Sequence, residues 1–340
     1  MKALSMTIVR HSPTAHAAYH DLLRLLLDDR TSDIRGTPTR VVRNGRVYWY
    51  DSFRVGTDVR KTYIGEETHE LLARIDRHRE LRAEGEARAS ERARLVRILR
   101  AERFLGHDAA TGSLLAAMAA AGVFRLGGTL VGTQAFRLYE GELGLRYRFD
   151  DLAQTGDIDI ASFERLSLAL DDRTEPTVEQ VLADFAFDPV PTIDHRPTWR
   201  WRQSKGGALV EFLTPAFGDE GVRPLAALGV SAQALHHLNY LIAGPIPAAV
   251  LYRSGVLVQI PRPERFAIHK LIVAARREAR DRIKAEKDRR QARFLIFALA
   301  EDRPYDLRDA YRDALGRGPK WQERIATTLA RIPDVADLLA

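Results

Sequence analysis

Two aspartates separated by one residue are the part of this sequence best suited to do chemistry. In Asp157-Ile158-Asp159-Ile160 the alternation of acidic and apolar residues is typical of a strand, whose side chains point to opposite faces in turn. Asp157 and Asp159 would then lie on one face and repel each other. A hard divalent cation such as Mg²⁺, held by one or two carboxylates and by substrate phosphates, is the usual solution. The pair therefore predicts metal-assisted chemistry on a phosphate, although a turn ending a surface strand would give the same local pattern.

A glycine corner and a third acid complete this set of candidate residues. Gly132 follows an apolar, strand-like run and precedes a helix-like stretch. A residue without a side chain lets backbone N–H groups approach a phosphate there, and the hydroxyl of Thr133 can donate to a phosphate oxygen. Glu211 lies in the middle of an otherwise apolar strand-like segment, residues 208–213. A buried carboxylate is costly unless it is paired or binds a metal, so we expect Glu211 to lie beside the aspartates as a third ligand.

These positions resemble the motif of the nucleotidyltransferase fold of the DNA polymerase β superfamily. That motif is an apolar residue, glycine, and glycine or serine, then acid-x-acid, then a further acid. Here the matching positions are Val131-Gly132-Thr133, Asp157 with Asp159, and Glu211. Bacterial members related to AbiEii-type toxins look most similar, over roughly residues 105–300. Thr133 departs from the usual glycine or serine but keeps a hydroxyl, and the long spacing from Gly132 to Asp157 indicates an insertion at about residues 139–151.

The resemblance implies a fold, a reaction and a cofactor. The fold would be α+β: a polymerase-β-like nucleotidyltransferase core, with a mixed sheet flanked by helices, a C-terminal helical domain and an N-terminal β/helical extension. The reaction would be Mg²⁺-dependent (or Mn²⁺-dependent) transfer of a nucleotide from an NTP. Asp157, Asp159 and Glu211 would be catalytic metal ligands, and Gly132 with Thr133 would hold the phosphates.

The C-terminal half adds charged residues on apolar helix faces. Lys270 is in helical register with Phe266 and Val273, and Asp288 is in register with Ala292. Buried charges at these positions predict either a polar site or an ion pair between two helices. In the AbiEii-like proteins a similar pattern implies that Lys270 contacts the triphosphate and that Asp288 lies in the active site. Arg276 and Arg277 are candidates for further phosphate contacts, with solvated arginines as the alternative.

Bulk composition sets broad limits. Hydrophobic residues make up 45% and charged residues 29% of the 340 residues, which is ordinary for a globular protein of two or three domains. Cysteine is absent, which excludes disulfides and thiolate chemistry and fits a cytoplasmic location. No signal-peptide pattern or run of about 18 apolar residues is present. The formal net charge of +6 and the pI of about 9.6 favour an anionic partner.

Periodicity and turn signals divide the chain into four expected domains. Residues 1–65 should form a short helix and a small antiparallel sheet with a turn at Asn44-Gly45, and 66–104 a long charged helix or linker. Residues 105–262 should form the core and 263–340 a helical domain. The sheet is basic and aromatic, so it could contact nucleic acid or simply pack on the protein. Within the core we expect helices at 109–121, 177–185 and 229–243, a buried strand at 123–131 opening a βαβ-like unit that ends at the aspartate strand, and a hairpin at 247–261.

The expected function is nucleotide transfer to an acceptor hydroxyl. The net positive charge and the resemblance to toxins favour RNA, such as a tRNA 3′ end, as the acceptor. A protein side chain and a small molecule are alternatives. A toxin would imply a cognate antitoxin as partner. The competing hypothesis is a non-catalytic binding module, an antitoxin or nucleic-acid adaptor that keeps the fold without the reaction.

Overall fold

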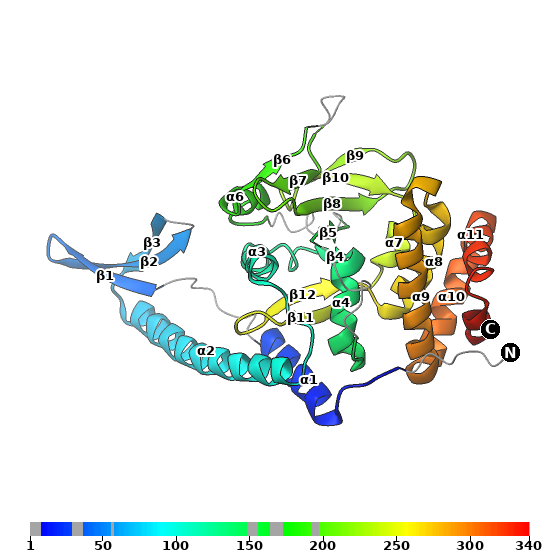
Figure 1. The fold of residues 1–340 in the computed structure, drawn as a ribbon. Coiled ribbons are helices and arrows are strands. Elements are labelled where there is room, and N and C mark those ends of the chain that lie inside the picture. Colours follow the sequence, from blue (N-terminus) through cyan, green and yellow to red (C-terminus); the bar gives the residue numbers. More distant parts are fainter. Residues whose placement is uncertain are drawn as a thin grey trace.

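The computed structural model describes residues 8–28, 37–55, 58–147, 156–163, 173–191 and 197–339. Its helices and a mixed sheet form a body, from which one long helix extends to a small separate sheet (Figure 1). Helix α1 (Pro13–Asp28) lies on the body, and the extension consists of strands β1 (Thr37–Arg43), β2 (Arg46–Val55) and β3 (Asp58–Glu66), followed by helix α2 (His69–Ala101). The predicted N-terminal helix, small sheet and long helix are confirmed.

The outlying sheet is antiparallel in the order β1-β2-β3. Asn44 and Gly45 both have positive φ, 50° and 75°, as a two-residue hairpin turn requires. One face of the sheet packs on α2, where Trp49 and Ile64 contact Leu71 and Ile75. This small apolar cluster fixes the sheet to the beginning of α2.

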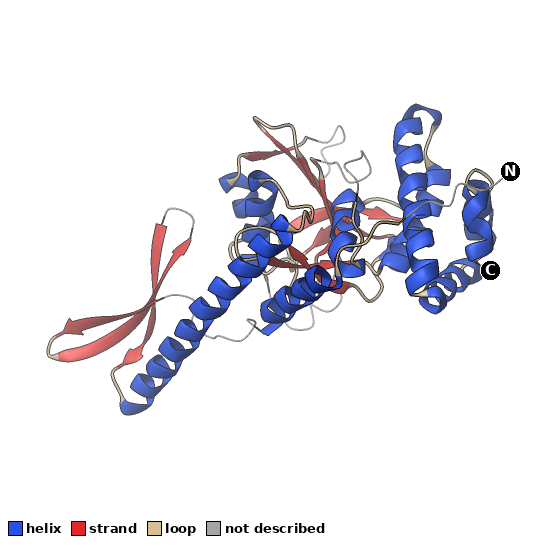
Figure 2. Ribbon diagram, turned by 60° about the horizontal axis from the view of Figure 1, so that its bottom comes forward, coloured by secondary structure: helices blue, strands red, loops and turns tan. Residues whose placement is uncertain are grey.

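The other end of α2 reaches the body. Leu95 and Leu99 pack with Tyr19 and Leu22 of α1, and the hydroxyl of Tyr19 accepts a hydrogen bond from the backbone N–H of Ala249 at 3.1 Å. Between the two apolar ends, α2 is mainly exposed and carries charged residues, as its sequence predicted. Figures 1 and 2 both show the small sheet standing away from the body.

The central sheet is mixed. Its main strand order is β4-β5-β8-β10-β9, with β7 pairing β8 and β6 pairing β7. Strands β5, β8 and β10 run parallel, whereas β4, β7 and β9 are antiparallel to their neighbours. The strands are β4 (Thr129–Val131), β5 (Ile158–Ala161), β6 (Phe187–Pro189), β7 (Arg200–Gln203), β8 (Leu209–Pro215), β9 (Val222–Leu225) and β10 (Val230–Leu235).

Helices and a hairpin pack around this sheet. Strands β11 (Ile246–Val250) and β12 (Val256–Ile260) form the predicted hairpin. The accompanying helices are α3 (Ala109–Ala120), α4 (Gly132–Leu143), α6 (Val178–Asp184), α7 (Leu238–Leu241), α8 (Pro263–Arg276), α9 (Arg282–Asp302), α10 (Pro304–Gly316) and α11 (Pro319–Leu329), with short 3₁₀ segments η1 (Ala279–Asp281) and η2 (Pro333–Leu338). Within the described ranges, none of these helices combines the length and apolar character needed to cross a membrane.

Three predictions in the core need correction. Residues 121–127 form turns and the strand begins only at Thr129, because the chain folds back so that the N–H of Gly128 donates to the carbonyl of Val123 at 2.9 Å. Strands β4 and β5 are antiparallel, so α4 does not cross over between parallel strands. The helix predicted at 229–243 is wrong: β10 alternates buried and half-buried residues with the period of a strand, and only Leu238–Leu241 is helical.

The insertion predicted at 139–151 falls partly inside α4, which continues to Leu143. Helix α4 ends at Gly144, whose φ of 62° is the left-handed conformation that glycine adopts most readily. Residues 148–151 of the predicted insertion lie outside the described residues.

Candidate active site

The carboxylates of β5 and β8 lie opposite one another. Strands β5 and β8 pair in parallel with Asp159 directly opposite Glu211, although the two residues are 52 positions apart in the chain. The neighbours Ile158 and Ile160 are buried, which confirms the predicted alternation. Asp157 immediately precedes β5, is exposed, and accepts a hydrogen bond at Oδ1 from the backbone N–H of Leu209 at 3.4 Å.

Burial, followed by repulsion between neighbouring carboxylates, raises the pKa values of Asp159 and Glu211. Burial, together with the charges of Glu211 and Asp157, raises the pKa of Asp159 from 3.8 to about 7. Burial and Asp157 also raise the pKa of Glu211, against the opposing charge of Arg200, whose Nη1 lies 4.0 Å from Oε1 of Glu211. Asp159 and Glu211 are direct neighbours across the two strands, so the charge of Glu211 disfavours the charged form of Asp159. With a pKa of about 7, Asp159 is protonated in part of the molecules at neutral pH.

Gly132 brings the start of α4 against this pair. Val131, the last residue of β4, lies opposite Asp159, and Gly132 then turns the chain into α4 with a φ of 64°. A Cβ at position 132 would lie 2.3 Å from Oδ2 of Asp159. Both the left-handed backbone and the close carboxylate therefore require glycine. The predicted strand-to-helix corner is confirmed at this position.

Thr133 and Gln134 occupy the next two positions of α4. Thr133 is half-buried, and its predicted phosphate contact stays a prediction. Gln134 is buried, and its Nε2 donates to the carbonyl oxygen of Asp157 at 3.3 Å. This contact ties the helix to the residue that precedes β5. Sequence reasoning missed Gln134; its signal was an amide in helical register with the apolar residue Leu138, among the buried residues of α4.

A cavity of about 360 Å³ lies between Asp159 and helix α8. Gly132 and Asp159 line it on the side of the sheet, while Lys270 of α8 and Arg276 and Arg277 at the end of that helix line it on the other side. Glu278 and Asp281 also line it beside these cations, whereas Glu211 does not. The cavity therefore brings one of the predicted acids together with three cations.

Lys270 and Asp288 form an ion pair between two helices, which was one of the two alternatives predicted from the sequence. Nζ of Lys270 lies 2.6 Å from Oδ1 of Asp288, and Nε of Arg277 lies 3.1 Å from Oδ2. Although burial opposes it, the charges of Lys270 and Arg277 hold the pKa of Asp288 below its ordinary value. The ion pair joins α8 to α9, and at the same time both cations line the cavity. Asp288 thus takes part in the site through the two cations that it positions.

Arg276 and His236 also line the cavity; Arg276 was a candidate from the sequence, whereas His236 was not selected. Nη2 of Arg276 lies 3.2 Å from Oε1 of Glu220, which also accepts the backbone N–H of His236 at 3.0 Å. His236 follows β10, whereas the sequence analysis assigned this region to a helix. His236 could have been selected from the sequence only if β10 had been identified as a strand, because residues at the carboxyl ends of parallel strands line such clefts.

The carboxylate oxygens of this site are suitable ligands for a hard divalent cation. Among the described residues, no group of three or more acidic or histidine side chains is already gathered as a metal-binding cluster. The close pair is Asp159 and Glu211, with Asp157 near enough to raise the pKa of both. Carboxylate oxygens are the ligands that Mg²⁺ and Mn²⁺ prefer, and a cation between these acids would replace the proton of Asp159.

The site thus combines neighbouring carboxylates on a mixed sheet with cations of α8 across a cavity. The chain belongs to a nucleotidyltransferase family: the family model described as nucleotidyltransferase matches residues 109–316, more than half of the sequence. The protein is accordingly a nucleotidyltransferase. Neither the curated proteins nor the solved structures gave a match. The matched region begins at α3 and ends at the last residue of α10, so β1–β3 and α2 lie outside it.

Proposed function

We propose that this protein is a Mg²⁺- or Mn²⁺-dependent enzyme with a polymerase-β-like core that transfers a nucleotide from an NTP to an acceptor hydroxyl. The observation that carries the proposal is the cavity that has Asp159 on one side and Lys270 with Arg277 on the other, with Glu211 opposite Asp159 on the neighbouring strand. A triphosphate needs cations around its oxygens. A carboxyl whose pKa is raised to about 7 by its acidic neighbours and by burial can exchange its proton for a metal ion.

Each residue of the site has a distinct task in this proposal. Asp157, Asp159 and Glu211 would hold the cation, which supplies positive charge to the phosphate oxygens when bound. The corner at Gly132 admits the phosphates to the backbone N–H groups at the start of α4. Lys270 and Arg277 neutralise the triphosphate from the other side of the cavity, and Asp288 keeps both cations in position.

The reaction itself is an in-line displacement. The acceptor hydroxyl oxygen forms a bond to the α-phosphorus of the NTP while the bond from that phosphorus to the α,β-bridging oxygen breaks, and pyrophosphate leaves. The hydroxyl proton passes to a carboxylate, for which Glu211 is our choice because it is half-buried and its pKa is raised. Positioning and charge neutralisation therefore account for most of the expected acceleration.

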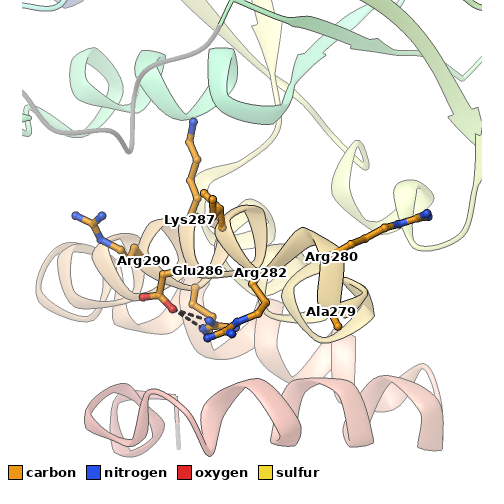
Figure 3. A pocket seen from close by; sticks show the side chains of 8 residues that line it. Ala279, Arg280, Arg282, Glu286, Lys287 and Arg290 are labelled. Carbon is orange, nitrogen blue, oxygen red and sulfur yellow. Dashed lines mark hydrogen bonds and ion pairs between the residues drawn. The ribbon is translucent and has the colours of Figure 1, made fainter.

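The acceptor is proposed to be RNA, because a basic surface lies beside the carboxylates. The open cavity in Figure 3, about 660 Å³, is lined mainly by side chains of η1 and α9, among them Arg280, Arg282, Lys287 and Arg290. Lys284, on the same helix, is near enough to Glu211 to oppose the rise in the pKa of that carboxyl. Basic side chains next to a reaction centre attract a polyanionic acceptor.

A labelling experiment tests the proposal. The protein is incubated with each α-³²P-labelled NTP, Mg²⁺ or Mn²⁺, and total RNA or protein, and the labelled product is identified on a denaturing gel. We expect transfer to RNA with one or two of the four nucleotides. The variant Asp157→Asn/Asp159→Asn should lose it, and the exposed control Asp309→Asn on α10, whose carboxylate forms only a 3.8 Å surface ion pair, should keep it. Binding of NTP without transfer to any acceptor would favour a non-catalytic module instead.

A further inference from the structure

The outlying sheet β1–β3 has two faces of different character. Its inner face is apolar and covered: Trp49 packs on α2, Arg79 of that helix lies over the Trp49 ring at 5.7 Å, and Nε1 of Trp49 donates to Glu67 at 2.9 Å. Residues that alternate with Trp49 along β2 point the other way. The outer face is therefore not needed to attach the sheet to the protein.

Three tyrosines meet on this outer face. Tyr48 and Tyr50 lie on β2, and Tyr63 lies on β3 directly opposite Tyr50. The ring centroids of Tyr50 and Tyr63 are 5.6 Å apart, and those of Tyr48 and Tyr63 are 6.3 Å apart. Tyr63 is 55% exposed and the other two are half-buried. Rings held this way by neighbouring strands form a platform with accessible aromatic surface.

Basic and hydroxyl groups surround the platform. The strand pairs place Arg43 opposite Arg46, and Lys61 opposite Ser52, on the tyrosine face, and all three cations are exposed. Glu66 also lies on this face, 3.8 Å from Arg46. The hydroxyls of Thr39 and Ser52 are hydrogen bonded to each other at 2.9 Å beside the rings. The face thus combines aromatic surface, net positive charge and hydroxyl groups.

We propose that the outer face of β1–β3 binds single-stranded RNA. Bases would stack on the rings of Tyr48, Tyr50 and Tyr63, since base–aromatic stacking tolerates any sequence, while Arg43 and Lys61 contact the phosphates. Hydroxyl groups near the rings can pair with the 2′-hydroxyls that distinguish RNA from DNA. The inference deepens the proposed function and rests on it in one respect only, that the bound strand is the acceptor.

The distance between this face and the cavity sets a length requirement. In Figures 1 and 2 the sheet and α8 lie on opposite sides of the body. Helix α2, with 33 residues, is about 50 Å long at 1.5 Å per residue. An RNA that occupies both places must span a distance of this order, about 15 stacked nucleotides at roughly 3.4 Å each. Shorter strands should bind the sheet without becoming better acceptors.

Fluorescence anisotropy with a labelled, unstructured 20-nucleotide RNA tests the binding face. The full-length protein is titrated without NTP or divalent cation, so the outcome does not depend on catalysis. Tyr48→Ala/Tyr63→Ala should weaken binding about tenfold or more, whereas Tyr305→Ala, a control at an exposed tyrosine of α10, should not. Tyr63→Phe should bind like the unaltered protein because it keeps the stacking ring. Arg43→Gln/Lys61→Gln should reduce the salt dependence of log Kd by about 1.4.

Binding of other nucleic acids and self-association of the protein are the measurements that could overturn the proposal. Equal affinity for single-stranded DNA or for duplex RNA would overturn the assignment to single-stranded RNA, as would equal binding by the double tyrosine variant. Self-association that is lost in Tyr63→Ala, measured by sedimentation, would instead identify the face as a contact between two copies of the chain. The part of the tryptophan emission that Trp49→Phe removes checks that each variant keeps the sheet folded, because Trp49 is one of four tryptophans in the chain. If labelling fails while RNA binding responds to the tyrosines, the proposed reaction is wrong and the binding face stands.

Discussion

Asp159→Asn should stabilise the protein in the absence of divalent cations, even though Asp159 is a proposed catalytic residue. In the folded protein the pKa of Asp159 is raised from 3.8 to about 7 by burial, Glu211 and Asp157. The folded state therefore retains a proton that the unfolded chain releases. Stability from this group is complete below about pH 4, declines as pH rises towards 7, and is absent above that. Asparagine remains neutral and can still donate to Glu211, so the variant should escape this loss.

The size of the effect follows from the same difference in pKa. Each pKa unit corresponds to about 1.4 kcal/mol, so about three units set an upper limit of about 4 kcal/mol above pH 7. Asp159 is only half-buried, and water near the pair screens the repulsion. We therefore expect a gain of about 1–2 kcal/mol in the free energy of unfolding, which corresponds to a rise in Tm of about 1.5–3 °C in a protein of this size.

Thermal unfolding from pH 4 to pH 9 in a chelating buffer provides the measurement. The difference in Tm between Asp159→Asn and the unaltered protein should be smallest at pH 4, grow steadily above that pH, and reach its full value by about pH 8. Asp309→Asn, which removes an exposed carboxylate, should show no such trend. With Mg²⁺ and an NTP the order should reverse, because only the unaltered protein gains from binding. A variant that is less stable than the unaltered protein at pH 8 without cations would refute the repulsion argument.

Three further predictions concern the corner, the ion pair and the cation. Gly132→Ala should lower the free energy of unfolding by about 1–3 kcal/mol and abolish stabilisation by NTP in scanning fluorimetry, because its methyl group would collide with Asp159. Gly156→Ala is the control, because an added Cβ there has nothing within 4 Å. Equal behaviour of the two variants would exclude a tight corner at Gly132. Lys270→Met should lower the free energy of unfolding in urea titrations by about 3–5 kcal/mol, because it leaves Asp288 without its closest partner. The double variant Lys270→Met/Asp288→Leu should regain most of the lost stability. Recovery of NTP binding in the double variant would contradict a phosphate contact by Lys270. The apparent affinity for Mg²⁺ should rise between pH 6 and pH 8, with proton release in calorimetry, because protons compete with the cation for Asp159; an affinity independent of pH would contradict this competition.

Local patterns predicted much of the candidate site. Alternation in Asp157-Ile158-Asp159-Ile160 places the isoleucines in the core, because a strand turns successive side chains to opposite faces. Glycine at position 132 corresponds to a left-handed turn between β4 and α4. Such signals depend on a few neighbouring residues. They are therefore present in the sequence itself.

Local pattern failed where burial and pairing outweighed it. Residues 229–243 look compatible with a helix, yet β10 forms there because it completes the sheet between β8 and β9. The start of β4 was misjudged because the run from Val123 is apolar whether it forms a strand or a buried turn. In both places the deciding contacts come from distant segments.

What the sequence determined by itself was the chemical content of the protein: which residues can carry charge, bind a cation or turn the chain, and on which face of a strand or helix each one lies. Only the tertiary structure decided that Asp159 lies opposite Glu211, that Lys270 is both paired with Asp288 and open to the cavity, and that the tyrosine face of β1–β3 is separated from the body by α2. The physical reason is that periodicity acts over a few residues along the chain. Strand register and helix packing instead depend on burying apolar surface contributed by segments that are far apart in sequence.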